Sequence, residues 1–148
     1  MPKIAIGSDH AGFELKQKAA GWLKAKGFSV EDLGTHSEES ADYPDFAKKV
    51  AKAVAAKKAD FGVLICGTGI GMSMAANKVK GVRAAVCHDA FSSQMAREHN
   101  DANVLCFGSR TADEKKAKEI VDKFFSTDFA GARDGGERHL RRVKKIEE

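Results

Sequence analysis

Short apolar runs alternate along the chain with longer segments in which apolar residues recur at helical spacing. Five of these runs have the length and composition of buried strands, and they cover residues 3–8, 28–33, 60–66, 82–87 and 103–108. Strands that alternate with helices are typical of a parallel sheet with helices packed on its faces. The pattern therefore predicts an α/β fold built on a five-stranded parallel sheet.

Two of the intervening segments show the apolar stripe of a helix that packs on a sheet. One stripe lies within residues 46–55 and the other within residues 117–125, and in both the apolar residues fall three or four positions apart. Pro44 stands where the first of these helices should begin, a position that suits its fixed φ and its missing N–H donor. A further helix, rich in basic residues, is expected at about 136–146.

The length and composition indicate a single domain over residues 1–148. With 43% hydrophobic residues, the chain can bury a substantial core without disulfides or metals. Its three cysteines, Cys66, Cys87 and Cys106, are widely spaced and form no Cys-x-x-Cys pair or His/Cys cluster. This spacing argues against a zinc site or a disulfide framework, and it suits a reducing compartment. We expect no metal and no other cofactor.

The amino-terminal sequence MPKIAIGSDH has no basic segment followed by a long apolar run. Nowhere do eighteen apolar residues follow one another, the length that a membrane-spanning helix needs. We therefore expect a cytoplasmic protein that does not bind membranes.

Polar side chains follow four of the predicted strands at the point where each strand ends. They are Ser8-Asp9-His10, the segment 66–71, His88-Asp89 and Gly108-Ser109-Arg110. Ligands of open parallel sheets bind beyond the carboxyl ends of the strands. This edge of the sheet is therefore the predicted binding site.

The segment CGTGIG at 66–71 joins a predicted strand to a predicted helix through three glycines. A dinucleotide fingerprint would need glycine where Met72 stands, and no phosphate-binding G-x-x-x-x-G-K-[ST] motif occurs. The free N–H groups of such a turn can hold a phosphate or a developing oxyanion. The same field favours a thiolate at Cys66, which could then act as a base.

Plainer interpretations of these residues stay open. The glycines could simply make a tight turn, and a free cysteine is more often a small buried hydrophobe. That second interpretation is our prediction for Cys87 and Cys106, which lie inside apolar strand runs.

The chain has a net charge of +4, and a basic cluster, RHLRRVKK, lies near its end at 138–145. In a helix, Arg138 and Arg142 share one face, with His139 three positions before Arg142, and together they could bind a phosphate dianion. A solvated helix face and a nucleic-acid surface are the alternatives. No aromatic residues are interleaved with these charges, so single-strand binding has no support, and we predict no nucleic-acid partner.

Several motifs, taken in order, resemble the type B ribose-5-phosphate isomerase family, which includes galactose-6-phosphate and allose-6-phosphate isomerases. The motifs are GSDHAGFELK, DYPDFA, CGTGIGMSMAANK, GVRAAVC, HNDANVL, GSR and GERHLRRV. The resemblance runs from about residue 4 to about residue 143. It implies a Rossmann-like three-layer α/β/α sandwich and an aldose–ketose isomerase that works without metal through a cis-enediolate.

The resemblance also implies roles for individual residues. Cys66 matches the base that moves a proton between C1 and C2, Thr68 matches its helper, and His99 matches the residue that opens the furanose ring. The backbone donors that hold the enediolate oxygens are matched by Gly67, Thr68, Gly69, Ile70 and Gly71.

Further residues match or are expected to make contacts with a sugar-phosphate substrate. Asp9 and Asn100 match contacts to sugar hydroxyls or the ring oxygen, and we expect Arg110, in the GSR motif, to contact the substrate as well. The phosphate ligands are matched by His10, Arg138 and Arg142. The segment FAGARDGGERH leaves Arg133 as an alternative to Arg138.

His99 and Asn100 precede the strand predicted at 103–108, whereas Cys66, Asp9 and His10 follow theirs. The two groups should therefore lie at opposite ends of the sheet. The simplest arrangement, which the resemblance also implies, is a two-fold homodimer in which each site uses both chains. Pairing of two dimers into a tetramer stays open.

Two alternatives to ribose 5-phosphate isomerisation remain. A hexose 6-phosphate isomerase would keep the same catalytic groups in a longer pocket. A module that binds a phosphorylated ligand without turnover would keep the glycine turn and the basic cluster, but it would not need Cys66 and His99.

Overall fold

The computed structural model describes all 148 residues and contains one sheet of five parallel strands. The strands are β1 (Lys3–Ser8), β2 (Ser29–Asp32), β3 (Phe61–Cys66), β4 (Ala84–Val86) and β5 (Val104–Gly108). Their order across the sheet is β2-β1-β3-β5-β4. All five predicted strands are therefore present, and the expected parallel α/β fold is confirmed.

Four strands are shorter than predicted, β3 and β5 by one residue each and β2 and β4 by more. At the start of β2 and β4, other groups in the chain accept the backbone N–H donors. The amide of Phe28 donates to the carbonyl of Leu23, so Phe28 belongs to the turn before β2 rather than to the strand. The amide of Arg83 donates to the side chain of Asn103 over 2.7 Å, and β4 begins one residue later.

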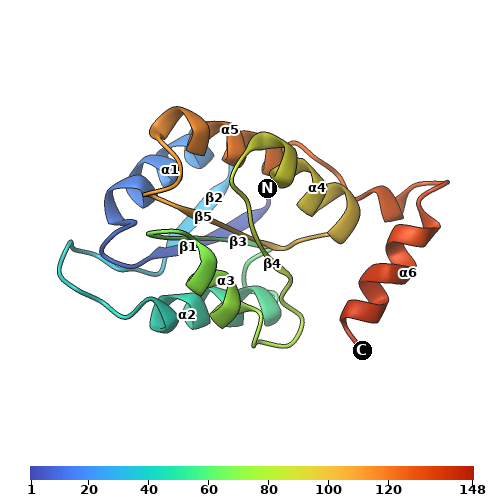
Figure 1. The fold of residues 1–148 in the computed structure, drawn as a ribbon, viewed down its shortest axis with the longest axis horizontal. Coiled ribbons are helices and arrows are strands. Elements are labelled where there is room, and N and C mark those ends of the chain that lie inside the picture. The colour runs from blue at the N-terminus through green and yellow to red at the C-terminus, as the bar shows by residue number, and fades with distance from the viewer.

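Helices cover both faces of the sheet. They are α1 (Phe13–Ala25), α2 (Tyr43–Ala55), α3 (Ile70–Ala76), α4 (Ala90–Asn100), α5 (Glu114–Phe125) and α6 (Glu137–Ile146), with a 3₁₀ turn, η1 (Ala130–Ala132). Figure 1 shows α1, α4 and α5 on one face, and α2 and α3 on the other. Pro44 lies in the first turn of α2, as predicted. No helix is long and apolar enough to cross a membrane.

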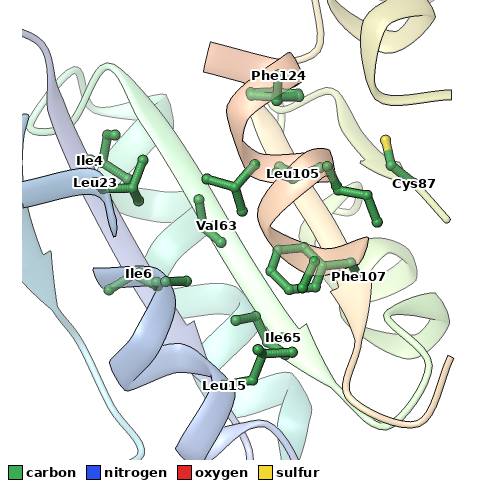
Figure 2. Close-up of a cluster of buried hydrophobic side chains, with 14 of the residues drawn as sticks. Ile4, Ile6, Leu15, Leu23, Val63, Ile65, Cys87, Leu105, Phe107 and Phe124 are labelled. Atoms are coloured by element: carbon green, nitrogen blue, oxygen red, sulfur yellow. The ribbon is translucent and has the colours of Figure 1, made fainter. Parts of the chain in front are cut away.

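The core has two halves because successive strand residues point to opposite faces of the sheet. Ile65 packs into the larger half with residues of α1, α4 and α5, and Figure 2 shows Leu15 and Phe107 beside it. Cys66, the next residue, packs on the other side against α2 and α3. This alternation carries Cys66 to the α2–α3 face, where the glycine turn begins.

The C-terminal helix α6 lies apart from the two layers, beyond β4 and beside α4 (Figure 1). It begins at Glu137, one residue after the predicted start. Its inward side is narrow, with His139 and Val143 buried, while its arginines and lysines are exposed.

Candidate active site

Three loops meet at the carboxyl edge of the sheet because backbone hydrogen bonds continue past the strands. The amide of Asp9 donates to the carbonyl of Ile65, and the amide of Ser109 donates to that of Cys66. One step further, the amide of Arg110 donates to the carbonyl of Gly67 over 2.9 Å. The residues after β1, β3 and β5 are thereby held side by side.

Cys66 ends β3 with its side chain 6% exposed. Its sulfur accepts a hydrogen bond from the amide of Gly69 over 3.1 Å. The turn therefore aims a backbone donor at the sulfur and fixes its position at the end of the strand.

Gly69 must be glycine for two reasons. Its φ of +82° lies in the left-handed region, and a Cβ there would come within 2.9 Å of the backbone of Phe107. The neighbouring hydroxyl of Thr68 accepts from the amide of Ile70 over 3.3 Å, and the side chain stays exposed. The turn is thus fixed against β5 while Thr68 faces solvent.

A pocket of about 440 Å³ opens over this turn, a size that suits a small ligand. Seven of the predicted site residues line it together: Asp9, Cys66, Gly67, Thr68, Ile70, Gly71 and Arg110. Gly69 is buried beneath them.

Tyr43 and Met74 also line this pocket, and the sequence analysis did not assign them to it. Tyr43 is the first residue of α2, and a Cβ on Gly71 would come within 2.5 Å of its ring. The tyrosine therefore packs directly on the glycine turn. The signal in the sequence is the motif DYPDFA, in which Pro44 fixes the start of the helix.

Asp9 and His10 are fixed by backbone donors. A carboxylate oxygen of Asp9 accepts from the amide of Gly12, and Nδ1 of His10 accepts from the amide of Ala41 over 3.1 Å. Since Nδ1 is an acceptor, a neutral His10 carries its proton on Nε2 and can donate it to a ligand. His10 lies beside the Cys66 pocket rather than on its lining.

The loop that holds His10 is itself fixed by a buried ammonium group. Lys16 on α1 is fully buried, and its Nζ lies 2.6 Å from both carboxylate oxygens of Asp32 and from the carbonyl of Thr35. The start of the loop between β2 and α2 is therefore anchored to α1.

Asp89, at the end of the fourth predicted strand, is not in this site. Its carboxylate accepts from the amide of Ser92 over 2.7 Å, and the hydroxyl of Ser92 accepts in return from the amide of Asp89. This hydrogen bonding lowers the pKa of Asp89. The residue is the N-cap of α4, the helix that carries His99.

His99 lies in a second pocket, of about 300 Å³, between α4 and the segment that leads into α6. Arg133 and Arg138 border this pocket as well, and it shares no lining residue with the Cys66 pocket. Arg142 is exposed on α6, and Asn100 borders other hollows near β4. One chain therefore does not bring all the predicted site residues together.

His139 does not join Arg138 and Arg142 on the exposed side of α6, contrary to the sequence interpretation. It is buried, and its ring stacks on that of His99 with centroids 4.4 Å apart. Burial, followed by the charges of Arg138, His99 and Arg142, lowers its pKa, whereas Glu98 acts in the opposite direction. His139 is therefore the neutral imidazole at pH 7.

The other two cysteines behave as buried hydrophobes, as predicted. Burial and the nearby charge of Asp89 raise the pKa of Cys87 to about 12. Burial, with the neighbouring thiols, raises the pKa of Cys106 well above its ordinary value. Nowhere in the chain do three His, Cys, Asp or Glu side chains gather into a group that could hold a metal ion.

Comparison with known proteins agrees with this geometry. The model of a family described as Ribose/Galactose Isomerase matches residues 4–146. Ribose-5-phosphate isomerase B of Escherichia coli is 50% identical over 99% of this chain and 95% of its own length. The solved structure of the Clostridium thermocellum ribose-5-phosphate isomerase B has a TM-score of 0.93 at 51% identity, over 98% of this chain and 95% of that one.

A structure from Mycoplasma genitalium, solved with bound ribulose-5-phosphate, has a TM-score of 0.91 at 46% identity, over 98% of this chain and 93% of that one. These similarities extend over nearly the whole chain and include the strands, the glycine turn and α6. This chain therefore belongs to the ribose/galactose isomerase family.

Proposed function

We propose that this protein interconverts ribose 5-phosphate and ribulose 5-phosphate, an aldose–ketose isomerisation of the pentose phosphate pathway. The observation that carries the proposal is the 50% identity, across 99% of the chain, to a ribose-5-phosphate isomerase B. The relative solved with bound ribulose-5-phosphate supports the same substrate pair. The pocket over the glycine turn supplies the groups that such a reaction needs.

Cys66 is the proton carrier in this proposal. Its thiolate takes the proton from C2 of the open-chain aldose, the electron pair forms the C1–C2 double bond, and the aldehyde oxygen becomes the oxyanion of a cis-enediolate. A proton passes from the C2 hydroxyl to the C1 oxygen, and Cys66 returns its own proton to C1. Positioned acid–base catalysis of this kind is worth about 10²–10⁴ in rate.

The glycine turn serves the enediolate in addition to the thiolate. Gly67, Ile70 and Gly71 of the turn, with the exposed hydroxyl of Thr68, line the pocket in which the negative charge develops. Fixed donors at that place stabilise the transition state without having to reorganise. Asp9 and Arg110 border the same pocket and contact the sugar hydroxyls.

His99 opens the furanose ring before proton transfer. It takes the proton of the C1 hydroxyl, the C1–O4 bond breaks as the aldehyde forms, and His99 delivers that proton to O4. Since His99 and Cys66 line separate pockets of one chain, we place His99 of one subunit at the Cys66 pocket of its partner in a two-fold homodimer.

Exposed apolar side chains support this dimer. Ile70 and Met74 beside the Cys66 pocket are 51% and 65% exposed, and Phe91 on α4 is 69% exposed. Large apolar side chains exposed on both α3 and α4 fit a contact between two subunits. Association through them would cover the glycine turn of each subunit.

The phosphate is held by cations from both subunits. His10, with its proton on Nε2, lies beside the Cys66 pocket, and Arg138 and Arg142 come from α6 of the partner. Arg133, which borders the His99 pocket together with Arg138, is the alternative ligand. The cytoplasmic location expected from the sequence stays a prediction.

A hexose 6-phosphate isomerase is the second candidate, because the matched family includes galactose isomerases by its description. An assay panel of ribose 5-phosphate, allose 6-phosphate and galactose 6-phosphate, each with and without EDTA, separates the two. We expect the highest kcat/KM on ribose 5-phosphate, unchanged by EDTA. Higher kcat/KM on a hexose phosphate would contradict the proposed substrate, and binding without turnover of any would contradict isomerisation.

A further inference from the structure

The rings of His99 and His139 form a parallel stack that joins two helices far apart in the sequence. The ring centroids lie 4.4 Å apart and the ring planes differ by 8°. His99 stands in the last turn of α4 and His139 in the first turn of α6. The stack is thus a contact between the body of the protein and the helix that stands apart from it (Figure 1).

Packing, rather than hydrogen bonding, sets the plane of the His99 ring. Of the five histidine side chains, only that of His10 makes a hydrogen bond within the chain. His99 is half-buried and His139 is 6% exposed, so the ring of His139 is the fixed surface on which the His99 ring rests.

Burial is the main cause of the lowered pKa of His139, and the charges around the stack modify it. Arg138 and Arg142 approach it from its own helix, and Glu98 and His99 face it from α4. Burial and the two arginines lower the pKa of His139, against a smaller opposite effect of Glu98.

We propose that His139 is a positioning residue for ring opening, whose stacked ring holds the imidazole of His99 at the angle needed to move a proton between the C1 hydroxyl and the ring oxygen. The inference rests on the proposed role of His99. It assigns no contact with the substrate to His139 itself.

Ring opening can be separated from proton transfer by the choice of substrate. Ribulose 5-phosphate cannot close a furanose ring, because its carbonyl is at C2 and its C5 oxygen carries the phosphate. Exchange of its C1 hydrogen with deuterium from solvent needs Cys66 and the enediolate but no ring opening. Turnover of ribose 5-phosphate needs both steps.

The test compares His139→Leu, which removes the flat ring, with His139→Phe, which keeps one that cannot titrate. We expect the Leu variant to lose about tenfold or more in kcat on ribose 5-phosphate, because small misplacements of a catalytic group cost factors of this order. We expect the Phe variant to stay within about threefold of the wild type. Deuterium exchange into ribulose 5-phosphate, followed by NMR, should stay within about twofold in both.

Two further variants serve as controls for this comparison. His99→Ala should show the pattern of the Leu variant, and Leu140→Ala, at an exposed neighbour on α6, should change neither rate. Wild-type turnover in the Leu variant, or no recovery in the Phe variant, would overturn the stacking role. A parallel loss of exchange would show that His139 supports the whole fold of the site instead.

Some results would contradict the proposed function or the role of His99 rather than the stacking role of His139. A wild-type protein that converts none of the sugar phosphates would contradict the proposed function, and normal turnover in His99→Ala would contradict the role of His99. If wild-type turnover proceeds without deuterium exchange, the comparison of Leu and Phe still decides the inference. His139→Gln replaces the Leu variant if that protein does not fold.

Discussion

The amide of Gly69 donates a hydrogen bond to the sulfur of Cys66 over 3.1 Å, so that the last residue of β3 is held by the turn that follows it. The donor is available because Gly69 adopts a φ of +82°. This hydrogen bond therefore ties the end of the strand and the thiol to the turn. Substitutions at Cys66 and at Gly69 test its two partners separately.

Cys66→Ser should lower kcat on ribose 5-phosphate by about a hundredfold or more while changing KM little, because a hydroxyl is a far weaker base than a thiolate. Steady-state kinetics measure both constants. Cys87→Ala, at a buried thiol outside the pocket, is the control and should keep the wild-type kcat. A Cys66→Ser enzyme with near-normal kcat would reduce Cys66 to a packing role.

Gly69→Ala should be more destabilising than Gly81→Ala, although both glycines have positive φ, +82° and +90°. The left-handed conformation costs each alanine about 1 kcal/mol, but only at residue 69 would the Cβ meet backbone, 2.9 Å away at Phe107. We expect an additional loss of about 1–3 kcal/mol in the free energy of unfolding at residue 69. Urea titrations of both variants measure this difference. Equal losses of unfolding free energy in the two variants would show that the turn relaxes to accommodate the added Cβ.

Mixing Cys66→Ala and His99→Ala subunits should restore activity. In a mixed two-fold dimer one shared site carries both lesions and the other carries neither. Random re-pairing of equal amounts makes half of the dimers mixed, so activity should return to about a quarter of the wild-type value. An inactive mixture, after subunit exchange has been verified by mass, would rule out sites that are shared between chains.

Arg142→Ala should raise KM for ribose 5-phosphate by about tenfold or more, since a charge-assisted contact to the phosphate is lost. The phosphate does not react, so the effect on kcat should be smaller. Arg141→Ala removes the same charge from the adjacent exposed position and serves as the control. The assignment fails if both variants raise KM equally, because general electrostatic attraction would then explain the effect.

The lowered pKa of His139 makes folding stability depend on pH. The unfolded chain protonates this imidazole near its ordinary value of 6.5, whereas the folded chain resists protonation because the ring is buried beside Arg138 and Arg142. The contribution of His139 to stability is therefore complete above that value and is lost as the pH falls through the lowered one.

His139→Phe cannot titrate, so its urea midpoint should decrease less than that of the wild type between about pH 7.5 and 5.5. Circular dichroism at several pH values measures the two curves. Parallel curves would place the acid sensitivity in other residues.

The sequence was sufficient for the parts of the structure that depend on local pattern. The apolar runs predicted the five strands, and Pro44 predicted the start of α2. The rule that ligands bind at the carboxyl edge brought Asp9, Cys66 and Arg110 to one pocket. Each of these inferences needs only the order of elements along the chain.

Contacts that depend on how helices pack could not be predicted in this way. Tyr43 reaches the pocket only because α2 packs on α3 at Gly71. The stack of His139 on His99 requires the position of α6 beside α4, which no pattern within α6 encodes. The sequence analysis placed Asp89 at the binding edge because it follows a predicted strand. Its hydrogen bonds to Ser92 show that it caps a helix instead.

The strand order also bears on how the chain is made. β1 and β2 can pair early in synthesis, but β3 needs β5 on its other side, and β5 follows two further helices. Until residue 108 has left the ribosome, the nascent chain presents an unpaired strand edge flanked by Val63 and Ile65, the kind of surface that invites aggregation. The interval between translation of β3 and of β5 is therefore when the nascent chain is most exposed to aggregation.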